Sequence, residues 1–325
     1  MKPVLSSESF SVVIPIKDEI ATLPELSRRL GSVLVDGLEG GEVVFVDDGS
    51  TDGSARWIAD LHTRDSRFKL VRLSRNFGHQ AAVTAGLAHA NGDAVVLMDG
   101  DLQDPPELIP ALVSKWREGF EIVHTVKIRR KESLPRRLAF AAFYRIMHAA
   151  SDTEMPLQSG LFSLLDRRVV DQLETMPERN RYLAGLRAWV GFRQTAVEYE
   201  RDARWSGAPR VSIARLFRLA FDGIFSFSNL PLRLATLLGL VVSLAAFLLI
   251  VTILYLKLFT DRAILGWASL MTATLFLGGV VLLTIGIIGE YVGRIYDEVK
   301  RRPLYIVAER VGFEERRLEG ADRRL

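Results

Sequence analysis

The sequence predicts an α/β protein whose mostly parallel, doubly wound sheet is followed by helices that enter a membrane. Two observations carry this prediction. Residues 10–205 alternate short runs of apolar and β-branched residues with segments of helical spacing, which is the pattern of strands joined by crossover helices. Further along, residues 234–256 and 263–289 carry no charged side chain, and each stretch is long enough to cross the hydrocarbon core of a bilayer.

Four short runs have the composition of strands. The runs at 10–16, 42–47 and 94–98 are mostly continuous apolar segments, as in strands buried on both faces of a parallel sheet. The run at 68–73 is interrupted by Lys69 and Arg72, which predicts a position nearer an edge. Segments with helical spacing separate or follow these runs, at 23–35, 54–61, 80–90 and 106–116.

The amino-acid composition excludes several classes of protein. The chain of 325 residues has 42 Lys and Arg against 39 Asp and Glu, and 49% of its residues are hydrophobic. This balance excludes a disordered chain and a dedicated nucleic-acid binder, so no nucleic-acid partner is expected. Cysteine is absent, which excludes disulfides, thiolate nucleophiles and zinc sites built on Cys.

Polar residues follow each of the four predicted strands. They are residues 15–19 (PIKDE), 46–52 (VDDGSTD), 73–78 (LSRNFG) and 98–106 (MDGDLQDPP). One such segment alone is commonly an ordinary turn. Carboxylates at several strand ends, with an arginine among them, predict a ligand site at the carboxyl edge of the sheet. The sequence has no GxGxxG or GxxxxGK motif, which argues against a dinucleotide oxidoreductase and a P-loop NTPase.

These residues have the chemistry of a site for a nucleoside diphosphate. Asp47 or Asp48 can accept hydrogen bonds from a base N–H or a ribose hydroxyl, and Arg75 can face the base or the phosphates. A second set offers the hard oxygen ligands that Mg²⁺ or Mn²⁺ prefers: Asp99, Asp101 and Gln103. A divalent cation there would neutralise a departing diphosphate.

Over roughly residues 9–310 the chain resembles the family 2 glycosyltransferases of the polyprenyl-phosphate type, a group that includes dolichol-phosphate mannose synthases and undecaprenyl-phosphate glucosyltransferases. The resemblance rests on the four segments above, with Val13 and Ile14 before Pro15, and on later motifs. These are 166–168 (DRR), 186–192 (LRAWVGF), 294–298 (RIYDE) and 302–305 (RPLY). It implies a single GT-A-like nucleotide-binding domain in which Asp99 and Asp101 form the catalytic metal motif. The nucleotide-sugar site that we expect consists of Pro15, Glu19, Asp47, Asp48, Arg75, Asp99, Gln103 and Arg204.

Two segments depart from the family pattern. Residues 16–19 read IKDE, where the family usually has Tyr-Asn-Glu or a close variant. Leu161 stands within GLFSL, where many members carry Gly-Asp-Phe-Arg-Leu and the Asp is the proposed base. A polyprenyl phosphate is already mostly a dianion at pH 7, so we hypothesise that transfer proceeds without a side-chain base.

The two uncharged stretches predict a transmembrane hairpin. Arg and Lys are in excess before the first stretch and after the second, whereas the short connection has Lys257 and Arg262 against Asp261. The positive-inside rule therefore predicts that both long ends are cytoplasmic. The N-terminal residues MKPVLSSES lack an apolar segment, so no signal peptide is expected. Zero cysteine and a hairpin anchor fit a bacterial inner membrane.

Basic and amphipathic segments are expected to meet the lipid. The segment at 127–145 carries seven Lys and Arg against one Glu, which favours anionic headgroups. The stretch at 211–227 reads as an interfacial helix. The arginines proposed to contact the lipid phosphate are Arg129, Arg130, Arg136, Arg137, Arg201 and Arg210. The expected organisation is a flexible 1–9, a catalytic domain at 10–205, an interfacial helix at 206–230, a hairpin at 231–292 with spans at about 234–256 and 265–289, and a cytoplasmic tail at 293–325.

The predicted function is inverting, metal-dependent transfer of a hexose from a nucleotide sugar to undecaprenyl or dolichyl phosphate at the cytoplasmic face. UDP-glucose and GDP-mannose are the leading donors, and no residue decides between them. One alternative is a processive polysaccharide synthase, although its QxxRW motif is replaced here by 186–189 (LRAW). Another is a catalytically silent membrane scaffold, which Leu161 favours and the Asp99–Gln103 cluster opposes. Gly278, Gly279 and Gly286 fit a homo-oligomer packed through the spans, but the oligomeric state stays open.

Overall fold

A computed structural model describes residues 8–36, 40–127, 159–179, 181, 183–199, 230–259 and 266–314. The chain divides into two compact units, which are described separately. The first comprises Met1–Ala139, Thr153–Arg210 and Arg302–Leu325, and it contains the sheet. The second comprises Phe140–Asp152 and Val211–Arg301, and it contains two long helices.

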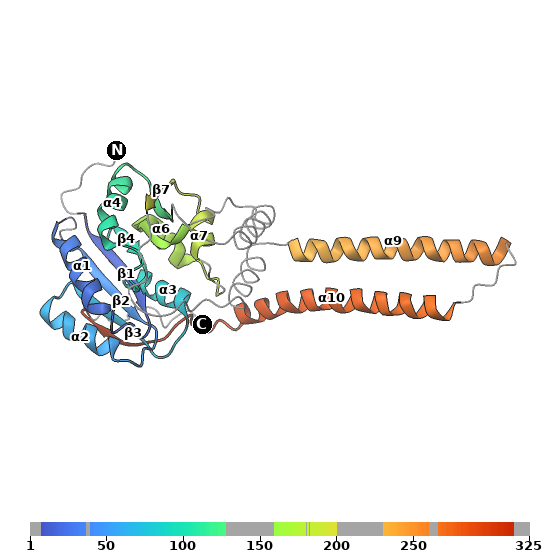
Figure 1. Ribbon diagram of the computed structural model, residues 1–325, viewed down its shortest axis with the longest axis horizontal. Coiled ribbons are helices and arrows are strands. Elements are labelled where there is room, and N and C mark those ends of the chain that lie inside the picture. Colours follow the sequence, from blue (N-terminus) through green and yellow to red (C-terminus); the bar gives the residue numbers. More distant parts are fainter. Residues whose placement is uncertain are drawn as a thin grey trace. The chain divides into compact units, whose positions relative to one another are not determined.

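From β1 to β5 the strands and helices of the first unit alternate along the chain (Figure 1), and the four predicted strands are β1 to β4. The strands are β1 (Phe10–Ile16), β2 (Glu42–Asp47), β3 (Phe68–Leu73), β4 (Ala94–Leu97), β5 (Ile122–Lys127), β6 (Ser159–Asp166), β7 (Gln194–Tyr199) and β8 (Val307–Val311). The helices are α1 (Leu23–Asp36), α2 (Ser54–Arg64), α3 (His79–His89), the 3₁₀ turn η1 (Pro106–Leu108), α4 (Ile109–Arg117), α6 (Arg167–Thr175) and α7 (Leu183–Trp189).

The sheet places the carboxyl ends of β1, β2, β3 and β4 next to one another. Its order is β7-β5-β6-β4-β1-β2-β3-β8, and β4, β1, β2 and β3 are parallel neighbours. The chain runs outward from β1 to β3 and then returns to the other side of β1 to form β4. Strand order thus reverses between β1 and β4, which is where open α/β sheets bind ligands. The predicted α/β fold with a mostly parallel sheet is confirmed.

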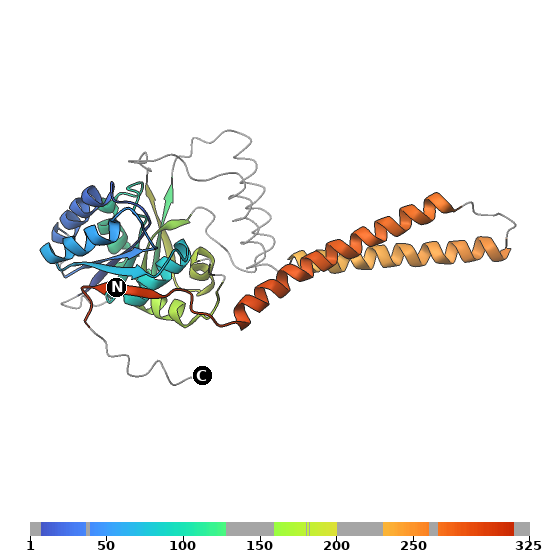
Figure 2. The ribbon, with the colours of Figure 1, turned by 90° about the horizontal axis from the view of Figure 1, so that it is seen from below.

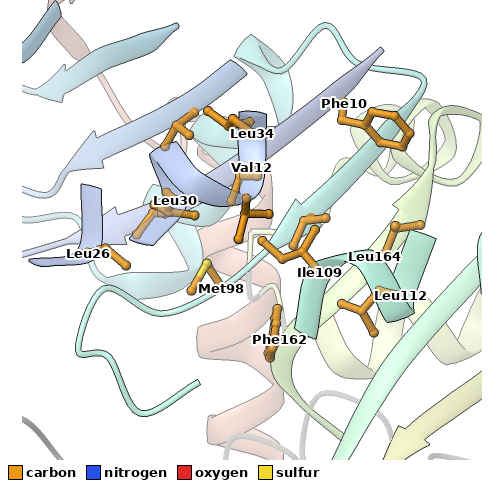
Figure 3. Packing of buried hydrophobic residues seen from close by; sticks show 14 of the residues in the cluster. Phe10, Val12, Leu26, Leu30, Leu34, Met98, Ile109, Leu112, Phe162 and Leu164 are labelled. Carbon is orange, nitrogen blue, oxygen red and sulfur yellow. The ribbon is translucent and has the colours of Figure 1, made fainter. Parts of the chain in front are cut away.

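Both faces of the central strands are buried, because helices cover each of them. Val12, Ile14 and Phe45 belong to one apolar cluster with residues of α1, α2 and α4. Figure 3 shows this packing, with Phe10, Val12, Leu26, Leu30, Leu34, Met98, Ile109, Leu112, Phe162 and Leu164 labelled. On α3, a Cβ added at Gly86 would overlap the side chain of Val13, so this helix lies directly on the strands. Because both faces of these strands are buried under helices, nearly every residue in them is apolar, which explains the continuous apolar runs of the sequence.

The eighth strand comes from the C-terminal segment, where the sequence analysis predicts no strand. β8 pairs antiparallel with β3, with Val71 opposite Arg310. Beyond the pairing, the Ser74 amide donates a hydrogen bond to the Ile306 carbonyl at 2.9 Å. β3 is therefore the second strand from the edge, close to the predicted position.

The second unit contains helices α9 (Leu230–Phe259) and α10 (Trp267–Val299), which contact each other and run in opposite directions (Figures 1 and 2). Their apolar side chains are exposed; Leu282, for example, is 72% exposed. Within the described residues, Thr272–Val299 is long and apolar enough to cross a membrane, and Ala235–Leu249 is a shorter apolar helix. One candidate span is thus found, and the second span of the hairpin stays a prediction. The predicted interfacial helix and the basic segment from residue 128 onward lie outside the described residues.

Candidate active site

The polar segments after β1, β2, β3 and β4 lie at one edge of the sheet, because these four strands are parallel neighbours. Hydrogen bonds tie the first two segments together. The Asp18 amide donates to Ser50 Oγ at 2.9 Å, and the Thr51 amide donates to Asp18 Oδ1 at 2.8 Å. Asp18 adopts a φ of 54°, a conformation that Asp tolerates better than most residues. The departure at 16–19 thus leaves an acidic residue that cross-links two loops.

Asp48 organises the segment after β3. Its two carboxylate oxygens accept hydrogen bonds from the amides of Phe77 at 2.7 Å and Gly78 at 3.0 Å. Its side chain is buried. Gly49 lies against the same segment, since a Cβ added there would come within 2.7 Å of the Asn76 nitrogen. Asp48, with Gly49 packed beside it, therefore fixes the loop that carries Arg75.

Asp47 has a different environment. Its side chain is fully buried, and Oδ1 accepts a hydrogen bond from the Ser50 amide at 3.0 Å. No described residue donates a hydrogen bond to Oδ2, although Arg72 Nε lies 3.8 Å away. Burial raises the pKa of Asp47, and the bonds from Ser50 and the charge of Arg72 act in the opposite direction. A buried acceptor without a hydrogen bond is uncommon and points to a missing donor.

Arg75 stands exposed at the end of the β3 segment. Its guanidinium carbon lies 4.3 Å from the centroid of the Phe77 ring, a cation–π geometry. Because Asp48 holds the Phe77 amide, the ring and the guanidinium above it are carried on a fixed loop.

The segment after β4 alternates in burial. Asp99, Asp101 and Gln103 are half-buried, whereas Gly100, Leu102 and Asp104 are buried. The loop is tightly constrained: a Cβ added at Gly100 would lie 2.9 Å from Ile16 Cγ2, and Leu102 has a φ of 59°. A left-handed conformation at Leu costs energy and is typical of functional sites. The three residues predicted as metal ligands thus share one exposure pattern on a closely packed loop.

The donor set fits a hard divalent cation only in part. Asp99, Asp101 and Gln103 offer carboxylate and amide oxygens, as Mg²⁺ and Mn²⁺ require. Within the described residues, however, no three His, Asp or Glu side chains lie close enough to hold a metal ion. A cation at this edge would need further oxygen ligands, such as those of a diphosphate.

The structure adds a residue that the sequence analysis misses. His79 begins α3, and its Nε2 lies 2.9 Å from Asp99 Oδ1. The signal in the sequence is slight: His79 directly follows the 73–78 segment, but it is twenty residues from Asp99 in the chain. A second contact ties the same loop to β7, because Tyr199 Oη donates a hydrogen bond to buried Asp104.

Leu161, at the position where a base is expected from the family pattern, lies on β6 next to a buried arginine. Arg187 of α7 donates to the carbonyls of Gly160 at 2.9 Å and Leu161 at 3.4 Å, and to Ser163 Oγ. On β5, buried His124 pairs with Ser163. Burial and the charge of Arg187 lower the pKa of His124 to about 4, so its imidazole is neutral at pH 7.

The remaining predicted residues fall into two groups. Pro15 lies within β1 opposite Val46, and Glu19 Oε2 accepts a hydrogen bond from Thr22 Oγ1 at 3.3 Å. Both therefore lie at the same edge as the aspartates. The others lie outside the described residues: Arg129, Arg130, Arg136, Arg137, Arg201, Arg204 and Arg210.

Comparisons with known proteins point to one family of enzymes. A family model described as "Glycosyl transferase family 2" matches residues 11–174. The chain is 45% identical to "Uncharacterized glycosyltransferase YkcC" of Bacillus subtilis, over 95% of this chain and 96% of the relative. It is 38% identical to "Bactoprenol glucosyl transferase" of Shigella phage SfII, over 91% and 96% of the two chains. Among solved structures, the Mycobacterium tuberculosis glucosyl-3-phosphoglycerate synthase with Mn²⁺, UDP and phosphoglyceric acid matches with a TM-score of 0.47 and 20% identity, over 68% of this chain and 77% of that one.

Proposed function

The chain belongs to glycosyl transferase family 2, and from that premise we propose that it transfers a hexose from a nucleotide-diphosphate sugar to a polyprenyl phosphate. The observation that carries the proposal is the set of acidic residues gathered at one edge of the sheet where strand order reverses. The bactoprenol glucosyl transferases that match most of the chain support a polyprenyl phosphate as the acceptor. UDP-glucose and GDP-mannose are the donors to test first.

We assign the nucleotide to the β2 and β3 ends. Asp47 Oδ2, which takes no hydrogen bond from the described residues, is suited to accept one from a base N–H or a ribose hydroxyl. Arg75 is exposed above Phe77 and can face the base or the phosphates with its planar fork. Asp48 supports the site indirectly by holding the loop that carries Arg75, because its carboxylate already accepts the amides of Phe77 and Gly78. Pro15, Glu19 and Arg204 complete the proposed nucleotide-sugar site.

We assign a divalent cation, Mg²⁺ or Mn²⁺, to Asp99, Asp101 and Gln103. When bound, such a cation supplies charge neutralisation for the departing diphosphate. Local contacts hold these residues in place, since the Gln103 amide donates to Asp101 Oδ1 at 3.2 Å and Gly100 packs against Ile16. Asp101→Asn should reduce turnover by about a hundredfold or more while thermal unfolding stays unchanged. Asp171→Asn, a change at an exposed aspartate of α6, serves as the control. Full activity of Asp101→Asn, or of the wild type in excess EDTA, would rule out the metal.

The reaction that we propose is an inverting displacement. A phosphate oxygen of the acceptor forms a bond to the anomeric carbon while the bond from that carbon to the diphosphate oxygen breaks, and the nucleoside diphosphate leaves. The acceptor phosphate, with a pKa of about 6, is mostly a dianion at pH 7, so most acceptor molecules carry no proton that a base must remove. The protein then has to position that oxygen and stabilise the leaving charge. Leu161 is compatible with this chemistry.

We further propose that α9 and α10 both span the membrane and that both ends of the chain are cytoplasmic. β8 lies in the catalytic sheet, after α10 in the chain, so the segment that leaves α10 has to reach the side on which the sheet lies. The arginines from Arg129 to Arg137, with Arg201 and Arg210, are proposed to contact the lipid phosphate, next to an interfacial helix at 206–230. Cysteine reporters test this topology, because the chain has no native thiol. In whole cells, an impermeant reagent should label a cysteine at Thr260 and spare one at Ser66; the reverse would contradict the proposal.

The activity is tested with a panel of nucleotide sugars. Full-length protein in detergent is incubated with each donor and a short-chain polyprenyl phosphate, and products are read by mass spectrometry. We expect one donor to give an acceptor whose mass has increased by a single hexose. A polymer of many sugars would favour a processive synthase. Mn²⁺-dependent nucleotide binding without any product would favour a scaffold.

A further inference from the structure

His79 and Asp99 form a direct contact between α3 and the segment after β4. The imidazole Nε2 lies 2.9 Å from Asp99 Oδ1. A carboxylate accepts hydrogen bonds, so Nε2–H of His79 is the donor in this pair. Both side chains remain partly open to solvent, with His79 48% and Asp99 33% exposed. The contact therefore lies at the surface of the site, where a substrate can reach it.

The backbone just before His79 is held by Asp48, which follows β2. β2 and β4 lie on opposite sides of β1. Asp48, at the end of β2, holds the amides of Phe77 and Gly78. Gly78 then turns the chain into α3 with a φ of 99°, which suits glycine. The helix that follows is packed tightly, since Gly86 lies against Val13. A continuous set of contacts thus runs from the β2 end, through the start of α3, to the β4 end.

We propose that His79 is a positioning residue that holds the carboxylate of Asp99 in the orientation needed to bind a divalent cation. The proposal rests on the assignment of Asp99 and Asp101 as cation ligands in the proposed function. The two aspartates are constrained differently: Asp101 Oδ1 accepts the Gln103 amide within its own loop, whereas Asp99 is held from a separate helix. Hydrogen-bonded partners of this kind orient ligating carboxylates, and their loss typically weakens metal binding by 10–100-fold.

The test compares two substitutions of His79 in the full-length protein in detergent. His79→Leu removes the donor, whereas the amide nitrogen of His79→Gln can reach a position similar to that of Nε2. Mn²⁺ is titrated in the presence of saturating UDP or GDP, and free Mn²⁺ is followed by its EPR signal. We expect the dissociation constant for Mn²⁺ to rise about tenfold or more in His79→Leu and to stay within about threefold of the wild type in His79→Gln. At saturating Mn²⁺, kcat of His79→Leu should recover.

The matched control is His62→Leu. His62 lies on α2, and its Nδ1 contacts the carbonyl of Phe68 at 2.7 Å. Phe68 is the first residue of β3, at the end of that strand opposite the polar segment. This variant should bind Mn²⁺ like the wild type, and thermal unfolding confirms that each variant is folded.

Three results would overturn the proposal. His79→Leu could bind Mn²⁺ as tightly as the wild type, or His79→Gln could bind it as weakly as His79→Leu. Pulsed EPR could also detect coupling of Mn²⁺ to an imidazole nitrogen that disappears in His79→Leu, which would make His79 a ligand instead. If the wild type transfers hexose and His79→Leu binds Mn²⁺ as tightly as the wild type, the positioning role of His79 is wrong and the proposed function stands. If the wild type binds no Mn²⁺ with either nucleotide and makes no lipid-linked hexose, both the positioning role of His79 and the proposed function are wrong.

Discussion

Asp47 and Asp48 are adjacent at the end of β2, yet their carboxylates have opposite surroundings. Both oxygens of Asp48 accept backbone amides of the segment after β3. One oxygen of Asp47 accepts the Ser50 amide, and the other takes no hydrogen bond from any described residue. Asp48 therefore shapes the loop that presents Arg75, while the Oδ2 atom of Asp47 is the acceptor that we propose for the nucleotide.

Asp48→Ala is expected to disorganise the proposed nucleotide site. Two hydrogen bonds to a buried charged acceptor would be lost, at about 1.5–3 kcal/mol each, so the free energy of unfolding should fall by about 3 kcal/mol or more. Affinity for UDP or GDP, measured by calorimetry, should fall with it. Asp60→Ala, at an exposed aspartate of α2, should change neither quantity. Unchanged nucleotide affinity in Asp48→Ala would show that the β2 and β3 ends do not form the nucleotide site.

Deleting β8 is expected to weaken the catalytic unit. A chain that ends at Arg301 loses the antiparallel partner of β3 and the carbonyl that accepts the Ser74 amide. The midpoint of thermal unfolding should drop by about 5–10 °C, since each kcal/mol is worth about 2–4 °C in a unit of this size. A chain that ends at Glu314 keeps β8 and should unfold like the wild type. Equal midpoints for the two truncations would mean that β8 adds no stability.

His124 is expected to make stability depend on pH. Its pKa is lowered to about 4 in the folded protein from an ordinary 6.5, so the unfolded chain binds the proton more tightly. The free energy of unfolding should therefore fall as the pH drops from about 6.5 to about 4, by at most about 3 kcal/mol at 1.4 kcal/mol per unit. His124→Asn should show a shallower fall in chemical denaturation across that range. Parallel curves for the two proteins would exclude His124 as the titrating group.

Leu161→Asp tests whether a side-chain base is missing. If the acceptor is already a dianion, the added carboxylate should change kcat by less than about tenfold, or roughly 1.4 kcal/mol of barrier. Activity of the wild type should decline as the pH falls below the pKa of the acceptor phosphate, about 6. A gain of about a hundredfold in Leu161→Asp would show that a base was needed.

The parts of the site that the sequence predicts are those carried by local patterns. Continuous apolar runs mark β1, β2 and β4, and the parallel arrangement then requires their acidic ends to meet. Contacts between distant segments leave no such pattern. β8 is five residues long and pairs with a strand more than two hundred residues earlier, and His79 reaches Asp99 from another element. Arg187 is visible in the sequence only as part of a motif, and its burial against β6 depends on packing.

The proposed function depends above all on the identity of the acceptor, which a comparison of two lipids decides. Purified full-length protein is incubated with Mn²⁺, a radiolabelled donor selected from the panel, and either a polyprenyl phosphate or the matching polyprenol, which lacks the phosphate. We expect label to enter the organic phase as a single hexose on the phosphate-bearing lipid and to be absent from the alcohol. Equal labelling of the alcohol, or label found only in a water-soluble polymer, would show that a polyprenyl phosphate is not the acceptor.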